Sequence, residues 1–361
     1  KIQKRIYQDL QSEDIEILFG NGYLANNNTY KLDGKTIKSK NIIIATGSYT
    51  SVPEGIEIDR ENIISHKEAI QMKSIPNSLI IIGADVEGIE FATIYSNFNT
   101  KIIMIDQKKE MLPGYDKDLK EPIKNNLEKK GVEFLLGEKA IKVEKYNKGV
   151  HVFLEEGKII SGEKCLIALG RKPSFPSGID NIGLKYSETG IKVDHNFTTN
   201  LSNIYAVGDV NGMCLLGSSA INQGISIASK LITGKNPEYS YNELPRAVFA
   251  DPQIAGAGLQ EYELKEKSIP YKVGKYMLSN TWRGISKCYD RGFVKVIIAD
   301  DGQILGIWFS GEDVSELVGT LGILIKEKIY ADQLKSNLFV HPSLSEGILE
   351  ALLNIDKGRK I

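Results

Sequence analysis

The chain has 361 residues, and its 45 basic and 46 acidic side chains give a formal net charge of −1. This balance excludes a strong field that would favour nucleic acid or an anionic membrane. The content of 42% hydrophobic and 25% charged residues is typical of a globular protein with room for two or three cores. The longest apolar run, residues 317–325, contains two glycines and a threonine and is too short to cross a bilayer.

Three cysteines, Cys165, Cys214 and Cys288, lie far apart in the sequence. Their spacing favours reduced thiols over a disulfide framework and predicts no metal site. We therefore expect a cytoplasmic protein. The chain begins at Lys1 without a methionine, which favours a missing leading segment and leaves organellar targeting open.

The first part of the chain predicts the end of a helix followed by a short strand over residues 15–19. Asp33 and Gly34 suit the positive φ angles of a tight turn and predict a hairpin within residues 26–40.

The next predicted strand has three consecutive isoleucines at residues 42–44. It ends in Thr46, Gly47 and Ser48, small residues that suit a close approach to a ligand. A linker with a short helical piece over residues 66–72 then leads to the segment that organises the chain.

That segment begins with the apolar run of residues 79–82, which is typical of a strand buried on both faces of a parallel sheet. Gly83 and Gly88 occupy the first and third glycine positions of a GxGxxG turn, which places a pyrophosphate at a helix N-terminus. The second position is Asp85, where a carboxylate should crowd and repel a phosphate. An ordinary strand-to-helix turn is therefore a serious alternative at this point.

Asp106 ends the following strand, 18 residues beyond Gly88 (106 − 88). An acidic residue at this offset binds the ribose hydroxyls of NAD and repels the 2′-phosphate of NADP. Its position favours a nucleotide site over the ordinary turn.

Two strands that end in a glycine and a polar group, residues 41–48 and 203–210, flank this complete βαβ unit. Open α/β folds bind ligands at such strand ends, so the order predicts one nucleotide domain inserted into another. The sequence after residue 241 predicts an antiparallel sheet, with a turn at Asp301 and Gly302, and two helices over residues 314–328 and 343–353. The other elements that we predict are helices over residues 116–130 and 218–232 and strands over residues 132–136, 140–145, 150–154, 164–169, 271–278, 293–299 and 304–310.

Seven motifs in this order resemble the flavin-dependent pyridine nucleotide disulfide oxidoreductases over nearly the whole chain. They are IIIATGS, GADVEG with Glu90, ALGRKP, IYAVGDV, FADPQIAGAGLQE, GFVKVIIADDGQILG and HPSLSE. Within that family the dihydrolipoamide dehydrogenases are the most similar. The resemblance implies a mixed α/β fold with an NAD domain inserted in a partial FAD domain and a C-terminal α+β dimerisation domain. The implied bounds are residues 1–68 and 198–241 for the FAD domain, 69–197 for the NAD domain and 242–361 for the dimerisation domain.

The resemblance also implies FAD and NAD as cofactors, a homodimer, and a lipoyl group or another small disulfide or dithiol as substrate. A 2-oxoacid dehydrogenase complex is a possible partner by the same analogy. The implied FAD contacts are Gly22, Thr46, Gly47, Ser48 and Asp209, together with Leu215, Leu216, Gly217 and Ser218. The implied NAD contacts are Gly83, Asp85, Gly88, Glu90, Asp106 and Gly170.

His341 and Glu346 match the acid/base pair of the family, in which the histidine of one subunit serves the reactive thiols of the other. On spacing alone, Ser343 and Glu346 form a capping box beside an incidental histidine, and both interpretations can hold together. The family's usual histidine two positions earlier is Phe339 here. We expect the remaining histidines, His66, His151 and His195, on the surface.

Neither the family's first GxGxxG nor its redox-active CxxxxC pair is in this sequence, so the chain as written cannot exchange dithiols. A non-catalytic dimeric nucleotide-binding subunit therefore remains an alternative. Relatives of the glutathione reductase and mercuric reductase kind are a second alternative. Asp106 argues against the NADPH-dependent members, while Lys108 and Lys109 leave that point open.

Overall fold

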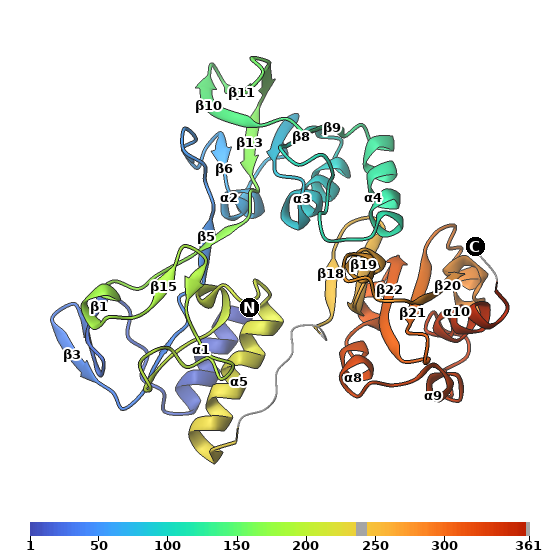
Figure 1. Ribbon diagram of the computed structural model, residues 1–361. Helices are drawn as coiled ribbons and strands as arrows, with labels where there is room; N and C mark the ends of the chain where they lie inside the picture. Colours follow the sequence, from blue (N-terminus) through green and yellow to red (C-terminus); the bar gives the residue numbers. More distant parts are fainter. Residues whose placement is uncertain (236–243, 359–361) are drawn as a thin grey trace. The chain divides into compact units, whose positions relative to one another are not determined.

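The structure is a computed structural model that describes residues 1–235 and 244–358 (Figure 1). The chain forms two compact units. The first unit combines Lys1–Tyr49 with Lys172–Tyr239, and the second combines Thr50–Arg171 with Ser240–Ile361. Among the helices of the described residues, none has both the length and the apolar character that crossing a bilayer requires.

The first unit is built on a parallel pair of strands, β4 (Ile42–Ile44) and β17 (Ile204–Ala206). Because the two strands run in the same direction, the polar residues that follow them meet at one edge, as the sequence predicts. Its other elements are α1 (Ile2–Ser12), β1 (Gly22–Asn26), β2 (Thr29–Leu32), β3 (Lys35–Lys38), η1 (Asp180–Ile182), β15 (Tyr186–Ser187), β16 (Gly190–Ile191), η2 (Gly208–Asn211) and α5 (Gly217–Thr233), while β5 (Ser48–Thr50) and β14 (Arg171–Pro173) lie where the chain passes between the units.

The hairpin predicted at Asp33 and Gly34 is confirmed. Strands β2 and β3 pair on either side of these two residues, which have φ angles of 44° and 84°. The strand predicted over residues 15–19 is wrong. Ile15 and Phe19 are 49% and 82% exposed, and this segment pairs with no strand of the described chain.

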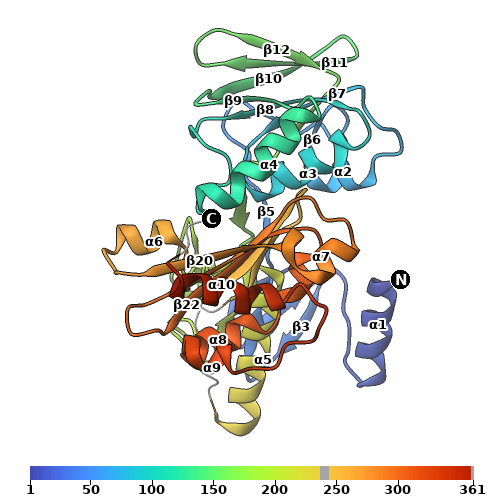
Figure 2. The same cartoon turned by 90° about the vertical axis from the view of Figure 1, so that its right-hand side faces the viewer.

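The centre of the second unit is a five-stranded parallel sheet in the order β6-β13-β7-β8-β9. Figure 2 shows α2, α3 and α4 on one side of this sheet and the antiparallel strands β10 to β12 on the other. Leu79 and Ile81 pack with the helices, whereas Ile80 and Ile82 pack with the antiparallel strands, so the apolar run is buried on both faces as predicted. The bounds are β6 (Ile63–Ile64), α2 (His66–Gln71), β7 (Ser78–Ile82), α3 (Val86–Ser96), β8 (Lys101–Asp106), α4 (Lys117–Lys129), β9 (Glu133–Leu136), β10 (Ala140–Tyr146), β11 (Gly149–Leu154), β12 (Ile159–Gly162) and β13 (Lys164–Ile167).

The C-terminal part of the same unit is an antiparallel sheet in the order β18-β19-β22-β21-β20. One face packs against α8, α9 and α10, and on the other face Trp308 joins the apolar core of α3 and α4. The helix predicted over residues 314–328 is broken into η5 and α8, and the last helix begins three residues later than predicted. The bounds are β18 (Arg246–Val248), β19 (Gln253–Gly258), α6 (Glu261–Glu266), β20 (Lys272–Met277), η4 (Leu278–Asn280), α7 (Trp282–Ser286), β21 (Phe293–Ile298), β22 (Ile304–Gly311), η5 (Val314–Leu317), α8 (Leu321–Lys326), α9 (Ala331–Lys335) and α10 (Glu346–Asp356).

A buried ammonium group joins the parallel sheet region to the antiparallel sheet. Lys295 is fully buried on β21, and its Nζ lies 2.6 Å from Asp116, 2.8 Å from Asp118 and 3.2 Å from Glu261. Asp116 also accepts hydrogen bonds from the backbone N–H groups of Glu261 and Tyr262. The three carboxylates thus surround a lysine, which supplies the positive charge that they require.

Candidate functional site

The glycine turn after β7 has the backbone geometry that a dinucleotide turn needs. Gly83 has a φ of +116°, and a Cβ there would lie 2.1 Å from the carbonyl oxygen of Ala168. A Cβ at Gly88 would lie 2.0 Å from the carbonyl oxygen of Gly83. The first glycine is therefore required for the tight turn and the third for close packing of α3 on the strand.

Asp85 occupies the N-cap position of α3. Its Oδ1 accepts a hydrogen bond of 2.8 Å from the backbone N–H of Val86. A helix N-terminus offers its free N–H groups and its dipole to an anion such as a phosphate. In this chain the side chain of Asp85 takes one of those groups itself.

The carboxylate of Asp106 lies at the end of β8 and is 8% exposed. Its Oδ2 accepts a 2.7 Å hydrogen bond from the N–H of Ala84, and its Oδ1 accepts a 2.8 Å hydrogen bond from the N–H of Lys108. Each carboxylate oxygen retains a second lone pair, so the group is fixed at the sheet edge and still able to accept ribose hydroxyls. Apart from Asp85, the residues of this edge fit an adenine dinucleotide.

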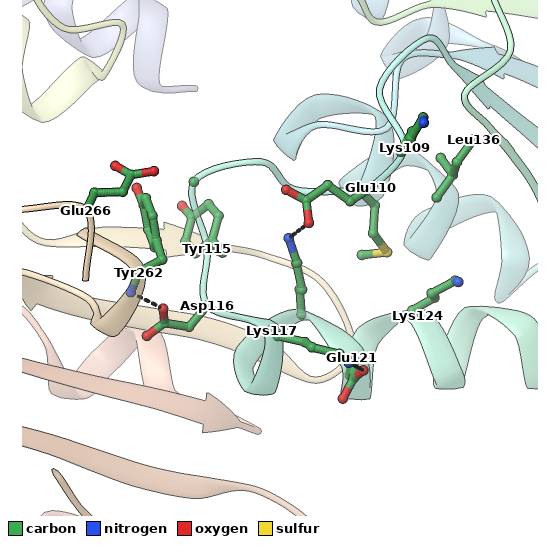
Figure 3. A pocket seen from close by; sticks show the side chains of 13 residues that line it. Lys109, Glu110, Tyr115, Asp116, Lys117, Glu121, Lys124, Leu136, Tyr262 and Glu266 are labelled. Atoms are coloured by element: carbon green, nitrogen blue, oxygen red, sulfur yellow. Dashed lines mark hydrogen bonds and ion pairs between the residues drawn. The ribbon is translucent and has the colours of Figure 1, made fainter. Parts of the chain in front are cut away.

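A cavity of about 450 Å³ lies beside the loop that follows Asp106. Figure 3 shows Tyr262 and Glu266 on one side of it and Lys109, Lys124 and Leu136 on the opposite side. Lys120 forms a 2.8 Å ion pair with Glu110 there. The sequence did not predict this cavity, because α6, which carries Tyr262, is distant in sequence from α4.

Polar groups of the first unit meet where β4 and β17 end. The hydroxyl of Ser48 donates a 2.5 Å hydrogen bond to Asp209 Oδ2, and the hydroxyl of Thr46 donates one of 2.5 Å to the carbonyl of Ser174. The Thr46 loop and Asp209, which the family resemblance names together as FAD contacts, therefore lie side by side. These hydroxyl and carboxylate groups suit the ribose, ribityl and phosphate groups of a flavin nucleotide.

The remaining predicted flavin contacts lie at three further places in the first unit. Gly22 begins β1, where a Cβ would lie 2.4 Å from the carbonyl oxygen of Lys31, and Gly47 has a φ of +69°. Leu216 is the N-cap residue of α5, and the helix begins at Gly217 and Ser218, while Leu215 is 49% exposed. Their contacts with flavin stay a prediction.

His341 and Glu346 are in direct contact. Nδ1 of the imidazole lies 2.6 Å from Oε1 of the carboxylate, and the two side chains are 60% and 23% exposed. Glu346 Oε2 accepts a 2.8 Å hydrogen bond from the N–H of Ser343, whose hydroxyl accepts one of 3.3 Å from the N–H of Glu346. The capping-box hydrogen bonds and the contact between His341 and Glu346 therefore coexist.

The charge of Glu346 is stabilised in this arrangement. The N–H of Ser343 and the neighbouring His341 hold the pKa of Glu346 below its usual range. Phe339, which replaces the family's second histidine, packs against the apolar core of the C-terminal sheet. The imidazole of His341 thus takes its orientation from Glu346.

His66 is not on the surface, contrary to the prediction. Its side chain is 20% exposed, because α2 begins at this residue against the parallel sheet. Nδ1 lies 3.5 Å from Glu87 Oε1, and Nε2 lies 3.4 Å from Arg171 Nη1. Burial and the nearby Arg171 lower the pKa of His66. No sequence pattern predicts this group of residues, since its members come from three separate segments.

The comparisons with known proteins agree with this architecture. Residues 1–226 match the family described as pyridine nucleotide-disulphide oxidoreductase, and residues 244–352 match its dimerisation domain. The chain is 31% identical over 324 residues to dihydrolipoyl dehydrogenase 2 of Haloarcula marismortui, covering 88% of this chain and 68% of that protein. It is also 31% identical over 352 residues to dihydrolipoyl dehydrogenase of Geobacillus stearothermophilus, covering 95% of this chain and 74% of that protein.

Solved structures show the same fold. The structure of LpdA from Mycobacterium tuberculosis superposes with a TM-score of 0.90 at 24% identity, covering 97% of this chain and 80% of that one. The flavoprotein disulfide reductase RclA from Escherichia coli superposes with a TM-score of 0.89 at 23% identity, covering 98% of this chain and 82% of that one. With its glycine turn, its paired strand ends and its histidine–glutamate contact, the chain belongs to the pyridine nucleotide-disulphide oxidoreductases.

Proposed function

We propose that the chain acts as a dihydrolipoamide dehydrogenase-like flavoprotein that oxidises a dithiol and reduces NAD. Overall, the dithiol loses two electrons and two protons and becomes a disulfide. NAD⁺ takes up a hydride, and one proton is released. The contact between His341 and Glu346 is the observation that supports this chemistry most directly, because it builds a base beside a carboxylate at the position matched by the family's catalytic pair.

His341 serves as the proton acceptor for a thiol. A thiol of pKa about 8.5 is mostly protonated near neutrality, and only the thiolate attacks a disulfide. An imidazole with an ordinary pKa of about 6.5 takes that proton and later returns it. Because Nδ1 faces Glu346, Nε2 is the nitrogen that serves the thiol. Glu346 stabilises the imidazolium that forms.

The homodimer belongs to this proposal, and the matched dimerisation domain supports it. By analogy with the family, His341 of one subunit serves the thiols of its partner. The three cysteines of the sequence given do not supply the redox pair. None of the three forms a disulfide within the described residues, and burial raises the pKa of Cys165, which makes it a poor nucleophile.

FAD, when bound, accepts electrons from the thiolates, and NAD accepts them as a hydride. Thr46, Ser48 and Asp209 are the residues proposed to hold FAD, with Gly22, Gly47 and Leu215–Ser218 beside it. Gly83, Gly88, Glu90, Asp106 and Gly170 are proposed to hold NAD. Asp106 selects against the 2′-phosphate of NADP. A lipoyl group is the proposed substrate, and a cytoplasmic 2-oxoacid dehydrogenase complex the proposed partner.

The test is a purified full-length protein assayed for a flavin spectrum and for NADH formation from dihydrolipoamide and NAD⁺. We expect both, and we expect His341→Gln to lower the turnover by about 10² to 10⁴-fold. His195→Gln is the matched control, since His195 is exposed, belongs to the first unit and contacts its neighbour Asn196 there. A colourless protein without turnover would favour a non-catalytic subunit, and preferred use of glutathione disulfide with NADPH would favour a glutathione reductase.

A further inference from the structure

Glu87 carries a buried carboxylate oxygen that the family resemblance does not account for. Within the described residues, Oε1 accepts no hydrogen bond, and His66 Nδ1 lies 3.5 Å from it. The side chain is 23% exposed. Burial raises the pKa of Glu87, while the nearby Arg171 opposes this effect. A carboxylate with so little compensation calls for a partner that carries positive charge.

The order of the strands in the parallel sheet indicates which half of a bound NAD would lie beside Glu87. Strand β7 lies between β8 and β13, so the switch point of the sheet is at its end. Asp106 marks the β8 side as the ribose side. Glu87 points to the other side, since His66 follows β6 and Arg171 follows β13. If the adenosine half of NAD lies over Asp106, the nicotinamide half lies on the side of Glu87.

The charged groups near Glu87 include the carboxylate of Glu90 and the guanidinium of Arg171. Glu90, one turn after Glu87, accepts a 3.0 Å hydrogen bond from the N–H of Phe249, and burial raises its pKa. Arg171 is the cation, and its proximity together with burial favours the neutral form of His66. The nicotinamide ring carries a positive charge in NAD⁺ and none in NADH, so this side discriminates between the two forms.

We propose that Glu87 is a specificity-determining residue that favours the oxidised nucleotide. Its carboxylate stabilises the cationic ring of NAD⁺ when this form is bound. The neutral ring of NADH gains little electrostatic stabilisation from it. The reduced nucleotide therefore dissociates readily, which suits an enzyme that forms NADH. This inference rests on the proposed function, because it requires NAD at the glycine turn.

Asp85 provides the matched control. It lies at the N-terminus of α3, where the pyrophosphate common to both nucleotide forms would bind. Its negative charge should weaken the binding of both forms by a similar factor. Replacing Asp85 therefore changes affinity, whereas replacing Glu87 changes the ratio of two affinities.

The experiment is calorimetric titration of the full-length protein with NAD⁺ and with tetrahydro-NAD, a redox-inert analogue whose ring is neutral. We expect Glu87→Gln and Glu87→Met to lower the affinity for NAD⁺ relative to the analogue by about three- to fivefold. Asp85→Asn should raise both affinities and leave their ratio unchanged. The difference should shrink as the salt concentration rises.

An unchanged ratio in both Glu87 variants, with both ligands still binding, would overturn the inference and leave the proposed function intact. Failure of the wild-type protein to bind either ligand would refute both. Circular dichroism of each variant shows that it is folded. Two substitutions of similar size protect the result against a packing defect in one of them.

Discussion

The buried lysine of the second unit leads to a sharp prediction about stability. Lys295→Met keeps most of the side-chain volume and removes the charge. It leaves Asp116 and Asp118 without the ammonium group that lies 2.6 Å and 2.8 Å from them. Removing one partner of a buried ion pair costs about 3 to 5 kcal/mol, because the remaining charge stays buried without compensation.

Other groups also stabilise these two carboxylates, and they determine where in this range the loss of stability falls. Lys275 also contacts Asp118, and Asp116 keeps the N–H groups of Glu261 and Tyr262. We therefore expect a loss of about 3 kcal/mol rather than 5. Replacing the acids as well, in a variant with Asp116→Asn and Asp118→Asn, should recover part of the loss, since Glu261 is then the one carboxylate of the three around Lys295 that keeps its charge.

The stability contributed by the ion pairs of Lys295 should decrease at both alkaline and acidic pH. Burial is the largest effect on Lys295 and lowers its pKa, but Asp118 and Asp116 together raise the pKa above its usual value. This stabilisation is present below about pH 10.4 and is lost as the pH rises through the folded-state value. The same lysine holds the pKa of Asp118 below its usual value, against the effect of burial. That part is present above about pH 3.9 and is lost in more acidic solution.

The assay is urea unfolding followed by circular dichroism, with Lys287→Met as control. Lys287 forms an exposed pair with Asp313 at 2.9 Å, and its loss should leave the midpoint within experimental error. The reasoning would be refuted if Lys295→Met unfolds at the wild-type midpoint. It would also be refuted if the variant lacking all three charges were less stable than Lys295→Met itself.

Three further outcomes follow from single contacts. Ser48→Ala should weaken flavin binding by about tenfold, seen as loss of yellow colour on dialysis, because Asp209 loses its hydroxyl donor. Gly256→Ala should destabilise the protein by about 1 to 3 kcal/mol in urea unfolding, since its Cβ would lie 2.5 Å from the ring of Trp308. Because the pKa of Glu346 is lowered, its contact with His341 should persist below the ordinary carboxyl pKa of about 4.3 and be lost only in more acidic solution, which an NMR titration of the imidazole would follow.

The sequence was most informative where one strand or one turn determines the structure. The apolar run of β7 and the hairpin at Asp33 follow from local patterns, and both are confirmed. The prediction of one continuous helix over residues 314–328 is wrong because of a local break. The helix η5 ends before Gly319, and α8 starts only at Leu321. Hydrophobic periodicity alone does not reveal such a break.

Strand β19 was missed because its sequence is rich in glycine, which normally argues against a strand. The reason for the glycine lies on the neighbouring strand. A Cβ at Gly256 would meet the ring of Trp308, which is fully buried across from it in the sheet. Only the pairing of β19 with β22 explains the choice, and nothing within β19 indicates that pairing.

The same distinction separates the polar groups that could be predicted from those that could not. His341 and Glu346 are five residues apart, and the capping box that fixes the carboxylate is written in the same short segment. Lys295 and Asp116 are 179 residues apart, and His66 reaches Arg171 across 105 residues. A local network has its geometry set by the turn that contains it, so its residues can be recognised together. A network between distant segments exists only after the elements pack, and there a charged residue looks the same in the sequence whether it ends buried or exposed.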